Sequence, residues 1–124
     1  MAEDYELCTY EKHHKLKILM FLASMREKRD ELIKSGYKVD YFDIEHSLFK
    51  KSYFTKLHTV IEKKSIQQVV LFEVEDKPFE NKLLNFLEGI DVHLEVLPSP
   101  MFKLARHEFS CLLYTSDAAD DSLR

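Results

Sequence analysis

Two short apolar segments, separated by the pattern of an amphipathic helix, constrain the fold of this chain more than any other feature. Residues 68–72 (Gln-Val-Val-Leu-Phe) form an apolar run typical of a strand that is buried on both faces. Residues 92–97 alternate between apolar and other side chains and stop at Pro98, which also predicts a strand. Between them, Asp76 and Pro78 mark the start of a helix. This order predicts parallel strands joined by a right-handed crossover.

The N-terminal half continues the alternation of helices and strands. A helix is predicted over residues 11–35, with Thr9 as its candidate N-cap and Gly36 as the residue that ends it. Residues 37–42 alternate and are rich in aromatic side chains, which predicts a strand. Ser52 is expected to cap a second helix. The apolar face of the first helix comprises Ile18, Phe21, Leu22, Met25, Leu32 and Ile33.

These elements predict an α/β fold of the open three-layer type, with a Rossmann-like parallel sheet. Such sheets normally begin with a central strand, whereas this pattern begins with a helix, so we expect the first strands to be missing and residues 1–110 to form a partial domain. The alternative is a small, genuine three-stranded domain. Residues 111–124 are small and acidic toward their end. We expect them to be a tail derived from a sequencing adapter and not native, the alternative being an ordinary disordered tail.

The composition excludes several classes of protein. A net charge of −4 over 124 residues gives no general attraction to nucleic acid or anionic lipid. No apolar run approaches the roughly 20 residues of a membrane span, so no membrane partner is expected. Two cysteines form neither a disulfide framework nor a zinc cluster, which favours a reducing compartment and a cytoplasmic location.

A basic cluster opens the first predicted helix: His13, His14, Lys15 and Lys17. Adjacent histidines point about 100° apart on a helix and cannot chelate one metal together, so we expect no metal site. His14 shares a face with the apolar residues and is expected to point inward. The remaining readings are a solvated ion-pair rim and a surface that binds another protein. A thiolate of Cys8 activated by His13 is a further, weaker alternative.

Acidic residues follow the strand at 68–72: Glu73, Glu75 and Asp76. Carboxylates at the carboxyl end of such a strand lie where α/β sheets bind ligands. They equally often cap the next helix, and this is the interpretation that we favour for the group.

Several blocks of the sequence together resemble one known family. The most specific is His-His-Lys-Leu-Lys-Ile at 13–18 followed by Ala-Ser-Met-Arg at 23–26, with Glu3-Asp4 and Thr9-Tyr10 upstream. Supporting blocks are 36–41, 70–74 and 98–109. Over residues 2–110 the chain resembles the deoxyribodipyrimidine photolyase-related proteins, which are bacterial iron–sulfur cryptochromes and (6-4) photolyases.

The resemblance implies an N-terminal α/β domain of the photolyase type. In the family, a larger helical domain holds FAD and a 4Fe-4S cluster and docks damaged DNA, and excited flavin donates an electron that reverses the lesion. Some members bind a lumazine antenna in the α/β domain. The family's opening Gly-Asp-Gln-Leu turn and its flavin domain are absent from this sequence, and Cys8 and Cys111 match none of the cluster cysteines.

By the same resemblance, Glu3 matches an acidic position near the antenna ring, and Phe21 matches a helix position facing that pocket, which its bulk would narrow. His13, His14, Lys15, Lys17 and Arg26 match the motif without an assigned role. We therefore expect a fragment of a light-dependent repair flavoprotein or cryptochrome that serves as its antenna-binding and scaffold domain and carries no catalytic residue or metal. No cofactor is expected on this fragment alone, and by resemblance the parent protein would carry FAD, a 4Fe-4S cluster and, in some members, a lumazine antenna. The partners of the fragment would be the missing flavin domain and, through the parent protein, damaged DNA. The alternative is a small stand-alone α/β nucleotide-binding or regulatory module.

Overall fold

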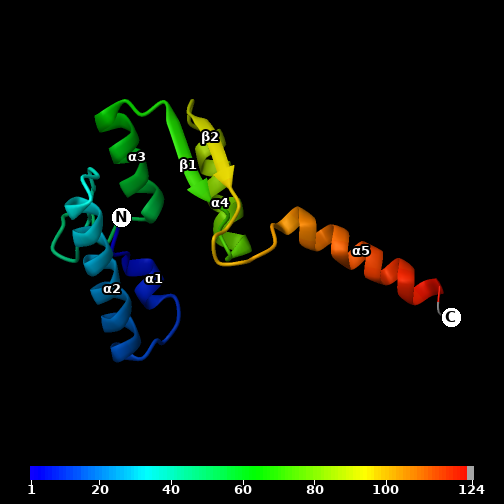
Figure 1. The fold of residues 1–124 in the computed structure, drawn as a ribbon. Coiled ribbons are helices and arrows are strands. Elements are labelled where there is room, and N and C mark those ends of the chain that lie inside the picture. The colour runs from blue at the N-terminus through cyan, green and yellow to red at the C-terminus, as the bar shows by residue number, and fades with distance from the viewer. Residues whose placement is uncertain (123–124) are drawn as a thin grey trace. The chain divides into compact units, whose positions relative to one another are not determined.

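A computed structural model describes residues 1–122 of the chain (Figure 1). The chain divides into two compact units, Met1–Ile66 and Gln67–Arg124, and each is described by itself.

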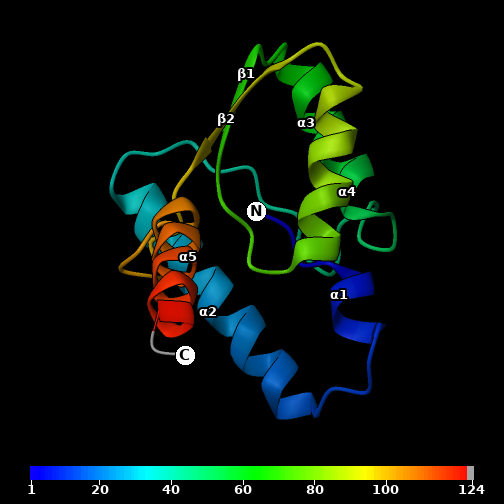
Figure 2. The same ribbon diagram turned by 90° about the vertical axis from the view of Figure 1, so that its right-hand side faces the viewer.

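The first unit contains three helices, α1 (Tyr5–Thr9), α2 (Lys15–Lys34) and α3 (Tyr53–Lys64). The loop that joins α1 to α2 is visible in Figure 2. Ser52 caps α3 through a hydrogen bond from the Thr55 N–H, as predicted. The prediction that Thr9 is the N-cap was wrong, because Thr9 is the last residue of α1. α2 begins later than predicted, and His14 is its cap.

The end of α2 has the predicted glycine geometry. Gly36 has a φ of +88°, the left-handed region that side chains with a Cβ avoid. The Gly36 N–H donates to the Ile33 carbonyl at 3.0 Å, and the Tyr37 N–H donates to the Leu32 carbonyl at 3.0 Å. This is a Schellman motif, and it fixes where the chain leaves the helix.

The strand predicted over residues 37–42 was wrong, because only Phe42 pairs with another segment. Phe42 forms an isolated parallel bridge with Ala2. The Glu3 N–H donates to the Phe42 carbonyl at 2.8 Å, and the Phe42 N–H donates to the Met1 carbonyl at 3.0 Å. The alternating aromatic residues thus favoured an extended segment. Its pairing with the segment around Ala2 is limited to a single bridge, so no strand forms.

The second unit contains β1 (Gln68–Phe72), α4 (Lys77–Glu88), β2 (His93–Leu97) and α5 (Arg106–Ser122). β1 and β2 are parallel, with Gln68 opposite His93 and Phe72 opposite Leu97. The predicted strand–helix–strand unit is therefore confirmed. Asp76 caps α4, with its carboxylate accepting the Phe79 N–H at 2.9 Å. α4 runs alongside the two strands (Figure 1).

β1 is not buried on both faces of the sheet within this unit, contrary to the sequence prediction. Its burial alternates, and Val70 and Phe72 are exposed whereas Val69 and Leu71 are partly buried. The exposed side chains of Val70 and Phe72 leave one face of this small sheet open among the described residues.

Few apolar side chains of the described residues are fully buried. Phe42 and Ile61 are buried in the first unit, and Leu83 and Leu87 in the second. On α2, Phe21 and Ile33 were predicted to belong to the apolar face but are exposed. The expected tail of residues 111–124 is helical as far as Ser122, and its last two residues lie outside the described part.

The structure is a mixed helix–strand fold with a small, open two-stranded parallel sheet, which agrees with the α/β class. The open three-layer, Rossmann-like type stays a prediction. Within residues 1–122, no helix combines the length and apolar character that a membrane crossing needs.

Candidate functional site

The Glu3 carboxylate is the centre of a polar cluster in the first unit. Its side chain is fully buried. Arg26 donates to both of its oxygens, from Nε to Oε1 at 2.6 Å and from Nη2 to Oε2 at 3.0 Å. The Tyr41 hydroxyl donates to Oε1 at 2.7 Å, and the Ile44 N–H donates to Oε2 at 3.0 Å. Four donors thus saturate the carboxylate, as a buried charge requires.

These contacts shift the acidities of the groups involved. The Arg26 hydrogen bond is the main cause of a lowered pKa for Glu3, and it outweighs the raising effect of burial. Burial, followed by the hydrogen bond to the Glu3 carboxylate, raises the pKa of Tyr41 to about 12. The cluster therefore holds a carboxylate and a neutral phenol at neutral pH. It is a structural anchor that joins α2 to the chain around residue 3.

A second buried ion pair lies beside this anchor. Lys56 Nζ contacts the Asp4 carboxylate at 2.9 Å, and each side chain is only 1% exposed. Lys56 also donates to the Phe49 carbonyl at 2.9 Å. The other oxygen of Asp4 accepts the Leu7 N–H at 3.1 Å and caps α1. Asp4 thus connects α1 to α3 through one side chain.

A cavity of about 270 Å³ lies between α1, the following loop and α2. Ile18, Leu22 and Met25 from α2 and Leu7 from α1 provide apolar walls, and polar groups lie among them. The volume of this cavity is slightly below the usual range for small-molecule pockets, which is about 300–1,000 Å³. The residues that line it are Ala2, Asp4, Leu7, Cys8, Tyr10, His13, Lys17, Ile18, Phe21, Leu22 and Met25.

The structure brings three of the predicted site residues together at this cavity: His13, Lys17 and Phe21. Phe21 is 55% exposed, so its ring borders the cavity and also meets solvent. Glu3 does not line the cavity, although its neighbours Ala2 and Asp4 do.

The other motif residues have different places. His14 is exposed and caps α2, because its Nδ1 accepts the Leu16 N–H at 3.2 Å. The prediction that His14 points inward was wrong, because the helix begins one residue after it. Lys15 is the first residue of α2 and is exposed. Arg26 binds Glu3, a role that the sequence did not indicate.

Cys8 lines the cavity with His13, yet its environment disfavours a thiolate. Burial is the largest effect and raises the pKa of the thiol, and the charges of Asp4 and Glu3 raise it further. An activated cysteine needs the opposite shift. The described residues contain no group of three or more histidine, cysteine or acidic side chains arranged to hold a metal ion.

Sequence reasoning missed the roles of Lys56 and Tyr41. A signal for Lys56 was available, since it lies three residues after Tyr53 and four before Val60 on the apolar side of its helix. A lysine on such a face needs a buried anion, and Asp4 supplies it. No comparable signal marks Tyr41, because Glu3, which accepts the hydrogen bond from its hydroxyl, lies 38 residues away in the chain.

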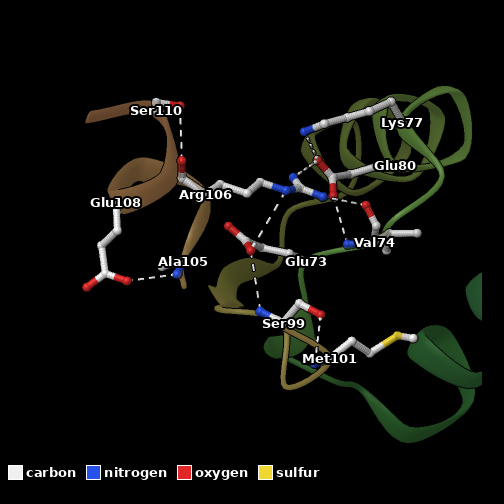
Figure 3. A network of polar contacts seen from close by, with 10 residues as sticks. All are labelled: Glu73, Val74, Lys77, Glu80, Ser99, Met101, Ala105, Arg106, Glu108 and Ser110. Carbon is white, nitrogen blue, oxygen red and sulfur yellow. Dashed lines mark hydrogen bonds and ion pairs between the residues drawn. The ribbon is translucent and has the colours of Figure 1, made fainter. Parts of the chain in front are cut away.

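The second unit has its own polar network at the carboxyl end of β1 (Figure 3). Arg106 donates from Nη1 to Glu80 at 2.7 Å and from Nη2 to the Val74 carbonyl at 2.5 Å. Glu80 also accepts the Val74 N–H at 2.8 Å. The Arg106 hydrogen bond is the main cause that lowers the pKa of Glu80 to about 2. This network fastens the start of α5 to the start of α4.

Two parallel strands joined by a helix, with Glu73 directly after the first of them, agree with the α/β class of proteins. Comparison with known families identifies the family to which the chain belongs. The family model of the deoxyribodipyrimidine photo-lyase-related proteins matches residues 1–119, and the chain therefore belongs to that family. The resemblance found in the sequence is confirmed. No curated protein sequence gives a significant match.

Proposed function

We propose that this chain is the antenna-binding α/β part of a light-dependent DNA repair flavoprotein or a related cryptochrome. In this proposal the chain binds a lumazine pigment and positions it. FAD and the iron–sulfur cluster belong to a helical domain that docks damaged DNA. Membership of the photolyase-related family supports the proposal. The observation that carries it is the cavity between α1 and α2, to which Phe21 contributes.

The lining of the cavity suits a flat ring with polar edges. Ile18, Leu22 and Met25 offer apolar contacts to the faces of a ring, and the Phe21 ring offers aromatic stacking. At the polar side, the Lys17 ammonium is a donor for the carbonyl oxygens of a lumazine or the hydroxyls of its ribityl chain. Pockets of this composition bind a ligand through apolar contacts, and a few polar groups fix the orientation of that ligand.

Glu3 acts in this proposal as a positioning residue. Its carboxylate is already saturated by four donors, so it does not bind the pigment directly. Through Arg26 it holds α2 against residues 2–4, and both segments contribute to the cavity lining. The motif Glu3…Arg26 thus sets the distance between two walls of the pocket.

The proposal assigns no catalytic residue to this chain. An iron–sulfur cluster of the four-iron type takes four cysteine thiolates, and the sequence contains two cysteines. Electron transfer and lesion reversal are therefore assigned to the flavin-bearing domain. The open three-layer sheet belongs to the same proposal. Sequencing the locus across both ends tests this part, and a Gly-Asp-Gln-Leu turn upstream with a flavin domain downstream would support it.

Pigment binding is tested by titrating the full chain into 6,7-dimethyl-8-ribityllumazine and following the fluorescence and polarisation of the pigment. We expect a saturable change. Phe21→Ala should weaken binding about two- to tenfold, the loss of one aromatic contact of about 0.5–1.5 kcal/mol. Leu19→Ala is the matched control, because Leu19 is an exposed residue of α2 that does not line the cavity.

The absence of a saturable change, or equal binding by wild type and Phe21→Ala, would contradict the proposal. Binding of a free nucleotide in place of the pigment, together with a gene that encodes no flavin domain, would favour the alternative of a stand-alone nucleotide-binding module.

A further inference from the structure

A second cavity, of about 380 Å³, lies in the second unit at the carboxyl end of β1. Glu73 directly follows that strand and lines the cavity. In open α/β sheets, ligands bind outside the carboxyl ends of the parallel strands. The complete lining is Glu73, Glu75, Phe102, Lys103, Leu104, Arg106 and Phe109. None of these residues takes part in the pigment site proposed above.

The apolar part of this cavity comes from Phe102, Leu104 and Phe109, and all three side chains are exposed. Two aromatic rings and a leucine that meet solvent around one hollow are typical of a surface that binds a ligand. Aromatic rings in such a setting stack on flat ligands, and one stacked base contributes about 1–3 kcal/mol.

The charged part is negative once its internal pairs are counted. The guanidinium of Arg106 is committed to Glu80 and to the Val74 carbonyl, as Figure 3 shows, and approaches Glu73 only to 3.8 Å. Glu73 Oε2 accepts the Ser99 N–H at 3.3 Å. Among residues 1–122, no hydrogen bond to Glu73 Oε1 or to the Glu75 carboxylate is formed by the protein.

Two carboxylates therefore face the cavity against the single ammonium group of Lys103. Carboxylate oxygens are acceptors only, so their natural partners are N–H donors or cations. A phosphate or carboxylate ligand would be repelled by them.

We propose that this cavity binds a flat, nitrogen-rich heteroaromatic base that carries an exocyclic amino group. Its ring lies against Phe102 and Phe109, and its amino edge donates to Glu75 and Glu73. The Arg106–Glu80 bridge has a positioning role, because it fixes the first turn of α5, which bears Phe109, against the start of α4.

The test uses the full chain and 2-aminopurine riboside, whose fluorescence is quenched when it stacks on aromatic rings. We expect saturable quenching, with purine riboside, which lacks the amino group, competing on the order of tenfold more weakly because a hydrogen bond to a charged group is lost. Phe109→Ala and Glu75→Gln should each weaken binding on the order of tenfold.

Two control variants in the same unit lie outside the cavity lining. Phe72→Ala removes an exposed ring from β1, and Glu88→Gln removes an exposed charge from the end of α4, and both should bind as wild type does. Absence of saturable quenching would overturn the proposal, as would binding that Phe109→Ala and Glu75→Gln leave unchanged. Equal competition by purine riboside would overturn the role given to the amino group. Phe21→Ala should leave this quenching unchanged. A failure of the base-binding proposal can therefore be distinguished from a failure of the proposed pigment site.

Discussion

Replacing Lys56 by methionine tests the buried ion pair that joins α1 to α3. The substitution keeps the length and apolar stem of the side chain but removes the charge that faces Asp4 at 2.9 Å. At an effective dielectric constant of about 20, two unit charges at this distance attract each other by about 6 kcal/mol, from which the cost of desolvation is subtracted. Measured losses for breaking a buried pair are about 3–5 kcal/mol.

We therefore expect Lys56→Met to lower the free energy of unfolding by about 3–5 kcal/mol. Urea unfolding of the full chain, followed by far-UV circular dichroism, would show this loss as a midpoint lower by about 2–3 M for a slope near 1.5 kcal/mol/M. Lys63→Met is the control, because Lys63 is an exposed residue of the same helix. Its midpoint should change little.

The double variant Lys56→Met with Asp4→Asn separates the ion pair from other effects of the methionine. Asparagine retains the oxygen that caps α1 and carries no charge, so no carboxylate is left buried without a partner. It should recover about 1–3 kcal/mol relative to Lys56→Met alone. If the double variant is the sum of the two single losses, or if Lys56→Met is as stable as Lys63→Met, the reasoning is refuted.

Four further predictions follow from individual contacts. The depressed pKa of Glu80 means that its stabilisation is present above its ordinary value of 4.5 and is lost as the pH falls toward about 2. After allowance for the partly exposed guanidinium, its size is on the order of 2 kcal/mol, and urea midpoints across this pH range should vary less in Glu80→Gln. Arg26→Lys, which cannot form the two-pronged contact with its carboxylate partner, should lower the thermal midpoint, and Arg26→Ala should lower it more; equal midpoints would contradict the anchor. Gly36→Ala should cost about 1–2 kcal/mol in urea unfolding, because alanine is strained at a φ of +88°. Iodoacetamide should label Cys8 more slowly than the exposed Cys111 at neutral pH, as mass spectrometry of digested protein would show, and faster labelling of Cys8 would contradict its raised pKa.

Local signals in the sequence were sufficient for the elements of the second unit. The apolar run at 68–72, the cap at Asp76 and the stop at Pro98 each depend on neighbouring residues, and the structure confirms β1, α4 and β2. Gly36 was predictable for the same reason, since a helix end is decided within one turn.

Features that depend on distant residues were not predictable. The pattern at 37–42 favoured a strand, but the extent of a strand is set by its partner, and only a bridge to Ala2 forms. The place of His14 depended on where α2 begins, and the helix begins at Lys15, four residues later than predicted. The burial of β1 depends on how many layers cover the sheet. The apolar run alone does not contain this information.

The same distinction between local and distant contacts applies to the candidate site. Phe21, His13 and Lys17 come together because they follow one another on α2 and the loop before it. Arg26 and Glu3 lie 23 residues apart, and their contact requires the tertiary fold. The sequence motif identified both residues through family resemblance, but the physical role of Arg26 emerges only from the structure.

The most direct test of the central claim is equilibrium dialysis of the full chain against lumazine and FAD in parallel, with Phe21→Ala as the reference variant. The account predicts that the chain retains lumazine and that Phe21→Ala retains less. It also predicts that FAD stays free, because the carboxylates of Glu73 and Glu75 at the second cavity repel the pyrophosphate next to its adenine. Stoichiometric retention of FAD, or a failure to retain lumazine above a control protein, would contradict it.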